Sequence, residues 1–325
     1  MLLWCCCFLV SYAPAALAER IPKLYMLVRD LSNLSAPMEH IEERTLSGQF
    51  LRNIDSWPID PNHFLSPVGM IAPVESSSFG VGLHFAIFES QGSGPSLVQY
   101  IRVVDLMGVE VARINSPGII YGTRFLWWDS SSHHFIVHHS SIQGARREYF
   151  DLLDLSGNRT PLLTLTGNRS LIGASYQTLA AGGQIFYSVS EPRGGVPVSS
   201  IERFDLSSGT TYVVIPPIFL YFGGVAALNY PEGLMFNVTI PGISQGFTLL
   251  HSPLHGLIFS PIDSFPAVSN SQALYSGDAT SSLDVYTSFR SGGASSGQIV
   301  VRSIDNTLQT YEFVSPFGVR ALFAR

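Results

Sequence analysis

Short apolar runs separated by turn residues recur along this chain at intervals of about fifty residues. Three segments of this kind share one order: a β-rich run that ends in Asp-Leu, a turn that contains Gly, and a further run with strand-forming residues. The three segments are Tyr100–Val111, Tyr149–Thr160 and Ile201–Tyr212. Their turns carry Asp105, Asp154 and Asp205, which we use as markers of the repeat.

Each of these segments predicts a β-hairpin, because an Asp side chain can cap turn amides and Gly accepts the positive φ of a tight turn. Two weaker copies follow: Leu249–Phe259 has His251 in the place of Asp, and Val300–Tyr311 keeps Asp305 but lacks the Gly. The five markers stand at 105, 154, 205, 251 and 305, which gives steps of 49, 51, 46 and 54 residues.

A second hairpin pattern lies upstream of four of the markers. Each copy consists of an apolar run, a polar or Gly-containing turn and another apolar run. The four segments are Arg124–His138, Gln177–Tyr187, Ala226–Phe236 and Asp278–Tyr286. Two hairpins in about fifty residues make a four-stranded antiparallel sheet, which is the unit of a propeller blade.

In these repeats the chain resembles the broad β-propeller superfamily, of the WD40, kelch, NHL and TolB-like kind. The resemblance extends over residues 80–325 and concerns architecture alone, since the chain has neither a Gly-His and Trp-Asp pair in each repeat nor a kelch Gly-Gly series. It therefore implies an all-β propeller of four-stranded antiparallel blades and carries over no functional residue.

The two ends of the chain fit a closed ring. Lys23–Leu34 resembles a sixth copy of the marker hairpin, and Gly318–Phe323 resembles an inner strand without a downstream partner. Pairing of the N- and C-terminal strands would complete one blade and remove a free sheet edge. The 75 residues from Asp30 to Asp105 exceed one repeat, so residues 46–75 are either a loop or part of a seventh unit. Six blades are favoured, and seven stay open.

The amino-acid composition is typical of a β-rich protein and argues against some classes of binding partner. Hydrophobic residues make up 46% and charged residues 13%, too few charges for the wet faces of long helices. The net charge is −6, and Arg146-Arg147 is an isolated basic pair. We therefore expect no nucleic-acid partner and no docking to anionic lipid.

Residues 1–18 have the pattern of a secretory signal peptide, with an apolar run, Pro14 and the small-residue site Ala16-Leu17-Ala18. A buried N-terminal strand is the alternative, because the segment lacks Lys and Arg before its apolar run. All three cysteines lie in this segment, so cleavage would leave residues 19–325 as a single propeller domain without disulfides or thiolate ligands. We expect a secreted, extracellular protein, monomeric and without stable membrane insertion.

Four Asn-x-Ser/Thr sequons support the same compartment, since each would need an exposed position on a secreted protein. The predicted glycosylation sites are Asn33, Asn158, Asn168 and Asn237.

The sequence evidence for metal-binding or catalytic residues is weaker than the evidence for the fold. His133, His134, His138 and His139 cluster, and strand alternation would place His134 and His138 on one face. A metal needs three or four ligands and no further ligand is indicated, so turn and strand histidines explain the cluster better. Gly293–Gly297 matches Gly-x-Ser-x-Gly, but a strand rather than a helix is predicted to follow it.

Acidic residues from different blades could form a catalytic pair, although most lie beside turns, where capping or solvation accounts for them. The possible donors are Asp129, Glu148, Asp151, Glu191, Glu202, Asp278 and Asp284.

The sequence thus predicts no cofactor, no metal site and no assigned catalytic residue. We expect a non-enzymatic secreted glycoprotein that binds a protein or a glycan through one propeller face, where loops vary while the blades stay rigid. The alternative is an extracellular propeller hydrolase or lyase that acts on glycans or small esters.

Overall fold

The computed structural model describes residues 23–324 except for 61, 63–67, 93–95, 117–122, 141–146, 180–181, 229–232, 240–246, 253–259, 266–271, 278–283, 294–295 and 304–310. The proposed signal peptide lies outside the described residues. No helix in the described part of the chain is long and apolar enough to cross a membrane.

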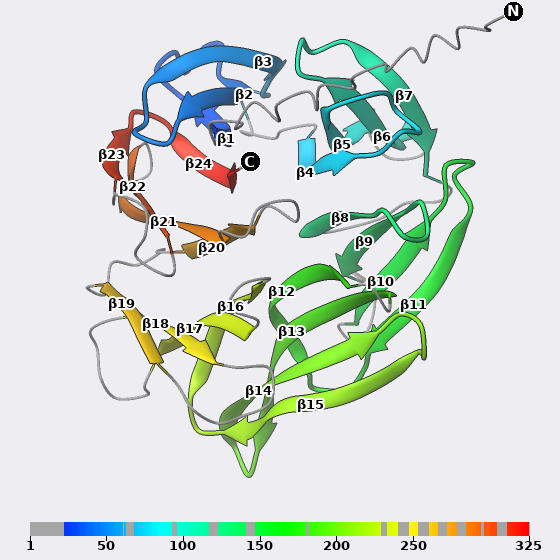
Figure 1. Cartoon of the computed structure of the whole chain (residues 1–325), viewed down its shortest axis with the longest axis vertical. Coiled ribbons are helices and arrows are strands. Elements are labelled where there is room, and N and C mark those ends of the chain that lie inside the picture. The colour runs from blue at the N-terminus through cyan, green and yellow to red at the C-terminus, as the bar shows by residue number, and fades with distance from the viewer. Residues whose placement is uncertain are drawn as a thin grey trace, which may run out of the picture.

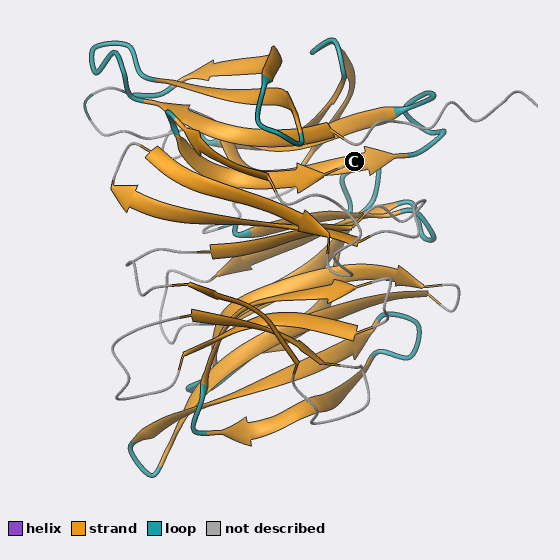
Figure 2. Cartoon of the chain, turned by 60° about the vertical axis from the view of Figure 1, so that its left-hand side comes forward, coloured by secondary structure: helices purple, strands orange, loops and turns teal. Residues whose placement is uncertain are grey.

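The described residues form six four-stranded antiparallel sheets, which follow one another around a ring (Figure 1). Strands account for the regular structure of the described residues (Figure 2). We number these blades 1 to 6 and give the strands of each from the centre of the ring outward. Blade 1 contains β24 (Gly318–Ala324), β1 (Lys23–Asp30), β2 (Met38–Thr45) and β3 (Phe50–Pro58). Blade 2 contains β4 (Val68–Glu75), β5 (Leu83–Gln91), β6 (Val98–Asp105) and β7 (Glu110–Asn115).

The remaining blades have the same order. Blade 3 contains β8 (Phe125–Asp129), β9 (His134–Ser140), β10 (Glu148–Leu153) and β11 (Arg159–Leu165). Blade 4 contains β12 (Ser170–Leu179), β13 (Gly182–Arg193), β14 (Val196–Asp205) and β15 (Thr210–Ile218). Blade 5 contains β16 (Tyr221–Leu228), β17 (Gly233–Thr239), β18 (Phe247–Ser252) and β19 (Ser260–Phe265). Blade 6 contains β20 (Gln272–Gly277), β21 (Asp284–Gly293), β22 (Ser296–Ser303) and β23 (Tyr311–Ser315).

The prediction of an all-β propeller of four-stranded blades is therefore confirmed, with six blades in the described part of the chain. Blade 1 takes strands from both ends of the sequence. Its innermost strand β24 pairs antiparallel with β1, so that Leu24 lies opposite Ala324 and Arg29 opposite Gly318.

The alignment of the first repeat was wrong by one strand, because the pattern predicted Lys23–Asp30 to be the third strand of a blade, whereas it is the second. Asp30 ends β1 and precedes the turn to β2, whereas the marker turns of the other repeats join the third and fourth strands of a blade. In blade 1 that turn follows Thr45, whose Oγ1 accepts the Gln49 N–H at 3.1 Å. Asp105 does the same in blade 2, where its Oδ1 accepts the Val109 N–H at 2.9 Å. Thr therefore replaces Asp as the cap.

Residues 46–75 are accordingly neither a long loop nor a seventh unit. They supply the outer strand β3 of blade 1 and the inner strand β4 of blade 2. The long apolar run from Tyr212 to Leu228 likewise divides into an outer strand, β15, and an inner strand, β16.

Apolar side chains of neighbouring blades pack against each other to form the core. Between blades 1 and 2, Leu27 and Ile41 pack with Phe85 and Ile87, all of them 0 or 1% exposed. A separate cluster joins blades 3 and 4. Burial on both sides explains why central strands such as β5 read as nearly continuous hydrophobic runs.

In blades 2 and 3 the marker glycine brings its turn close to the preceding blade. Gly108 has a φ of +78°, and a Cβ at this position would lie 2.3 Å from the carbonyl oxygen of Ile54 in β3. Gly157 approaches the carbonyl oxygen of Asn115 in the same way, with an added Cβ at 2.3 Å. Gly is thus required both by the turn conformation and by contact between blades.

We predict that Gly108→Ala lowers the free energy of unfolding by about 2 kcal/mol more than Gly167→Ala does. Both glycines have a φ of +78°, but a Cβ at Gly167 meets nothing within 4 Å. The pair therefore separates backbone strain from the clash between blades. Chemical denaturation of both variants measures the difference, and equal losses would contradict the role assigned to the close approach.

Candidate functional site

The two ends of the ring carry different connections. In every blade the second strand ends and the third strand begins at the end of the ring where the outer strand finishes. We call this end the connection face. The opposite end, which carries the marker turns and the turns between first and second strands, is the marker face.

The connection face has its longest segments between blades 1 and 2 and between blades 2 and 3. The crossings to blades 2 and 3 each take nine residues, 59–67 and 116–124. No connection between the strands at the marker face takes more than seven residues, the length of 76–82. Long loops on a rigid frame commonly carry function, so the connection face is the candidate binding surface.

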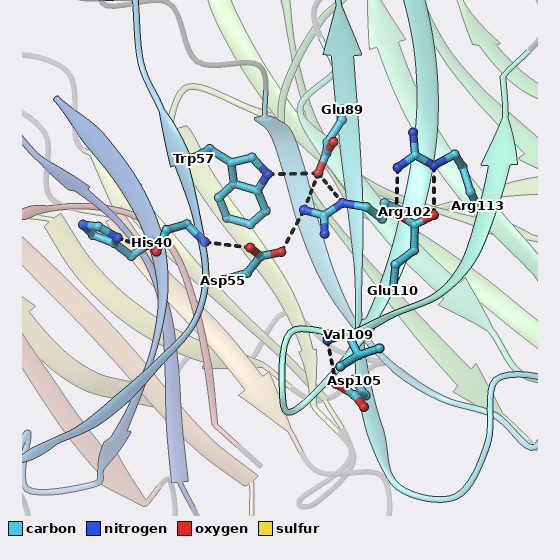
Figure 3. A network of polar contacts seen from close by, with 10 residues as sticks. His40, Asp55, Trp57, Glu89, Arg102, Asp105, Val109, Glu110 and Arg113 are labelled. Carbon is cyan, nitrogen blue, oxygen red and sulfur yellow. Dashed lines mark hydrogen bonds and ion pairs between the residues drawn. The ribbon is translucent and has the colours of Figure 1, made fainter. Parts of the chain in front are cut away.

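A network of buried polar groups lies near this face between blades 1 and 2 (Figure 3). Glu89 of β5, only 5% exposed, accepts hydrogen bonds from Trp57 Nε1 of β3 at 3.0 Å and from Arg102 Nε of β6 at 2.8 Å. Arg102 Nη2 also donates to Asp55 Oδ2 of β3 at 2.8 Å. The network thus joins the two blades through one arginine and two carboxylates.

Electrostatics holds this network in its charged form. Burial by itself disfavours the guanidinium, but the adjacent Glu89 and Asp55 carboxylates raise the pKa of Arg102. Burial and the hydrogen bond to Glu89 raise the pKa of the Tyr100 hydroxyl as well. Glu89 is therefore surrounded by donors, as a buried carboxylate must be to offset its desolvation.

We predict that Glu89→Gln lowers the free energy of unfolding by about 3 kcal/mol, because it leaves Arg102 without one of its two anionic partners. Glu110→Gln is the matched control, since Glu110 pairs with Arg113 at the surface and both side chains are more than one-third exposed. The Glu110→Gln control should lower the free energy of unfolding by less than about 1 kcal/mol. Urea denaturation of the two variants checks the contrast, and a similar cost in both would show that the network contributes nothing specific.

Arginines of blades 1 and 3 also bind the inner strand of the following blade. Arg320 of β24 donates to the carbonyl oxygens of Val68 and Gly69, at 3.2 and 3.5 Å. Its Nη1 also donates to Glu39 Oε1 at 2.6 Å, and Arg29 binds the same buried carboxylate. A single glutamate beneath the surface therefore orients two arginines.

Arg124 has the equivalent role in blade 3. It donates to the carbonyl oxygens of Leu171 and Ile172 in β12, at 3.0 and 2.8 Å. Glu148 stands six residues before the turn residue Asp154, as Glu39 stands six before Thr45, and both glutamates are fully buried. Both blades thus have an arginine at the start of the innermost strand that binds the next blade and a buried glutamate at the same position of the third strand, although Glu148 contacts His138 where Glu39 contacts two arginines.

The predicted histidine cluster does not converge. His138 Nε2 lies 3.1 Å from Glu148 Oε2, His139 Nε2 lies 2.8 Å from Asp151 Oδ2, and His134 Nδ1 lies 2.6 Å from the carbonyl oxygen of Ser132. His133 stands before β9 with a φ of +59°. Each ring has its own surroundings, and the described residues contain no group of three or more potential metal ligands.

His138 is the buried member of this set. Its side chain is fully buried, and its Nδ1 has no hydrogen-bond partner among the described residues. Burial lowers the pKa of His138, and this effect exceeds the opposing influence of Glu148. The folded protein therefore binds a proton at this ring at lower pH than the unfolded chain does, which makes the free energy of unfolding fall as pH drops below about 6.5.

We predict that His138→Gln reduces this loss of stability on the acid side, since an amide can still donate to Glu148 but does not titrate. Chemical denaturation at about pH 7.5 and about pH 5.5 measures the difference for the variant and the wild type. An unchanged difference would show that another group causes the acid sensitivity.

The described acidic candidates are tied to structural partners, and two of them, Glu191 and Glu202, both contact Arg169. Asp129 accepts from the hydroxyls of Ser131 and Ser132, both at 2.6 Å, and these contacts cap its turn. The remaining contacts are those of Glu191 with Arg193 at 2.6 Å, and of Glu202 with the Tyr187 hydroxyl at 2.9 Å and with Arg169. Asp278 lies outside the described residues, and Asp284 begins β21.

The serine motif and the sequons can also be placed. Gly293 ends β21 and Ser296 begins β22, so strands flank the motif on both sides; Ser295 lies outside the described residues. Three sequon asparagines, Asn33, Asn158 and Asn168, are exposed in turns. The fourth, Asn237, lies within β17 opposite Leu249. Occupancy of the four sequons stays a prediction.

One arrangement escaped sequence reasoning. Ser56 Oγ lies 2.9 Å from His40 Nδ1, and Asp30 Oδ2 lies 3.9 Å from His40 Nε2. These residues come from three neighbouring strands, so nothing in their spacing points to the contact. The carboxylate is too distant for a hydrogen bond, and the Ser56 N–H donates to Asp55. The contact is a cross-strand polar pair.

The paired arginines and glutamates were missed for a related reason. The only sequence signal was a charged residue within a largely apolar strand, as at Arg102 and Glu89. Such a signal indicates that a partner is needed but does not identify the partner.

Solved structures share this fold. TolB from Acinetobacter baumannii matches with a TM-score of 0.60 and 14% identity, over 93% of this chain and 66% of that chain. A chain of the nidogen/laminin complex matches with a TM-score of 0.54 and 8% identity, over 93% of this chain and 98% of that chain. At such identities the likeness shows the fold alone: the chain has the fold of the β-propeller superfamily. No protein-family model and no curated protein sequence matches the chain.

Proposed function

We propose that this protein is a secreted glycoprotein that acts as a non-enzymatic binding scaffold and engages a protein or glycan through its connection face. The observation that carries the proposal is that β3 ends and β4 begins, and β7 ends and β8 begins, at the same end of a ring of paired strands, with nine residues of sequence between the strands of each pair. Loops held by a rigid frame can vary in sequence without loss of the fold.

The buried networks support the rigidity of this end. Arg320 and Arg124 each bind the inner strand of the following blade through two carbonyl oxygens. Glu89 joins blade 1 to blade 2 through Trp57 and Arg102. A ligand that contacts these arginines would therefore meet side chains already held in place by hydrogen bonds, which lowers the entropic cost of association.

The likeness to a chain of the nidogen/laminin complex is compatible with protein binding, because the same fold occurs there within a protein complex. Secretion and glycosylation rest on the signal-like residues 1–18 and on the exposed positions of Asn33, Asn158 and Asn168.

We predict that full-length protein made in eukaryotic cells appears in the medium, cleaved after Ala18 and carrying N-linked glycans. Intact mass before and after treatment with peptide N-glycosidase measures both features. Asn33→Gln and Asn168→Gln should each remove one glycan without preventing secretion, because both side chains are exposed. Recovery of uncleaved, unglycosylated protein from the cytosol would refute the proposed compartment.

A further inference from the structure

Charge is distributed unequally between the two faces, although the chain as a whole is acidic. Six described arginines lie at strand ends on the connection face: Arg29, Arg124, Arg147, Arg169, Arg193 and Arg320. The marker face carries acidic residues at its strand ends and turns: Glu75, Asp105, Glu110, Asp154 and Asp205. The marker face also carries Lys23, Arg52 and Arg159, but Lys23 and Arg52 share the buried Glu43 and Arg159 lies 3.2 Å from the buried Asp151, so they offset these carboxylates only in part.

Burial of carboxylates at the connection face increases the difference in surface charge between the two faces. On the connection face the carboxylates Glu39, Glu89 and Glu148 are 0 to 5% exposed, so they lie beneath the surface. Both arginines that bind Glu39 remain partly accessible, since the side chains of Arg29 and Arg320 are 27% and 32% exposed. An approaching ligand would thus meet these guanidinium groups before it met the carboxylate that orients them.

Counted with the three buried carboxylates, three partly exposed ones equal the six arginines in number, so this face offers accessible guanidinium groups and no excess of positive charge. Asp30, Asp60 and Glu191 are partly exposed there, and Glu191 is already paired with Arg193. The Arg193 side chain is itself 60% exposed, and Arg147 is exposed just before β10. These two side chains can reach a ligand without dismantling a buried network.

We propose that the connection face binds an anionic oligosaccharide that carries carboxylate or sulfate groups. This inference rests on the proposed function and specifies its ligand class. Arginine offers planar, bidentate hydrogen bonding to such groups. The arginines come from blades 1, 3 and 4 and do not form a continuous basic stripe, which favours separated charges along a sugar chain over the dense phosphates of nucleic acid.

An apolar group on the same face fits a sugar ring. Phe219, in the crossing from blade 4 to blade 5, is 66% exposed. An exposed aromatic ring provides apolar area at low entropic cost, against which the C–H face of a sugar can pack. Inorganic anions and lipid headgroups have no apolar C–H face that would pack against this ring.

The test measures binding of the secreted, glycosylated protein to heparin and to hyaluronan oligosaccharides, with dextran as a neutral control. We expect salt-sensitive binding to at least one anionic glycan and none to dextran. Arg147→Gln combined with Arg193→Gln should weaken binding about tenfold. Arg159→Gln is the matched control, because it removes an arginine from the start of β11 on the marker face.

Absence of salt-sensitive binding to both anionic glycans would overturn the inference, as would equal weakening by the control variant. Tighter binding to phosphatidylserine vesicles or to single-stranded DNA than to either glycan would also overturn it. The two proposals can fail separately. If a neutral glycan or a protein binds the connection face and neither anionic glycan does, the inferred ligand class is excluded but the scaffold function remains.

Discussion

The structure depends on covering both apolar faces of every blade. A four-stranded sheet with side chains such as Leu27, Phe85 and Ile87 on its flanks is not stable alone in water, because each flank must be removed from solvent. Neighbouring blades meet that requirement for one another. Strand β24 then supplies the innermost strand of blade 1, so residues from both ends of the chain contribute to the same sheet.

Close contact between blades imposes two further constraints. At the marker face, Gly108 and Gly157 allow a turn to rest on the backbone of the preceding blade. At the connection face, Arg320 and Arg124 bind carbonyl oxygens of the following inner strand. Both kinds of residue thus hold neighbouring blades together. The glycines let two backbones approach at the marker face, and the arginines donate hydrogen bonds to backbone carbonyl oxygens at the connection face.

The buried ions connect the fold to its proposed role. A carboxylate such as Glu39 costs free energy when it leaves water, and two arginines that surround it offset this cost. The same pairing orients those arginines at the connection face. A structural requirement of the interface between blades therefore also produces a preorganised surface that carries guanidinium groups, on which the inferred glycan binding depends.

Local patterns in the sequence predicted the strands, the hairpins and the size of the repeat, because alternating apolar positions and turn residues act over a few neighbours. They were insufficient for blade 1, where Thr45 caps a turn that Asp caps elsewhere and Asp30 occupies a different turn. Both hydroxyl and carboxylate oxygens can accept turn amides, so residue type alone did not identify the equivalent position.

By itself, the sequence determined that the chain is an all-β repeat protein with enough apolar residues to pack its blades. Tertiary structure decided which charges meet, since Arg102 and Asp55 are 47 residues apart and Arg320 and Glu39 are 281 apart. Such contacts arise from the arrangement of sheets around a ring and have no fixed spacing along the chain. For the same reason, only the fold revealed which arginines lie at the connection face and which buried carboxylates orient them.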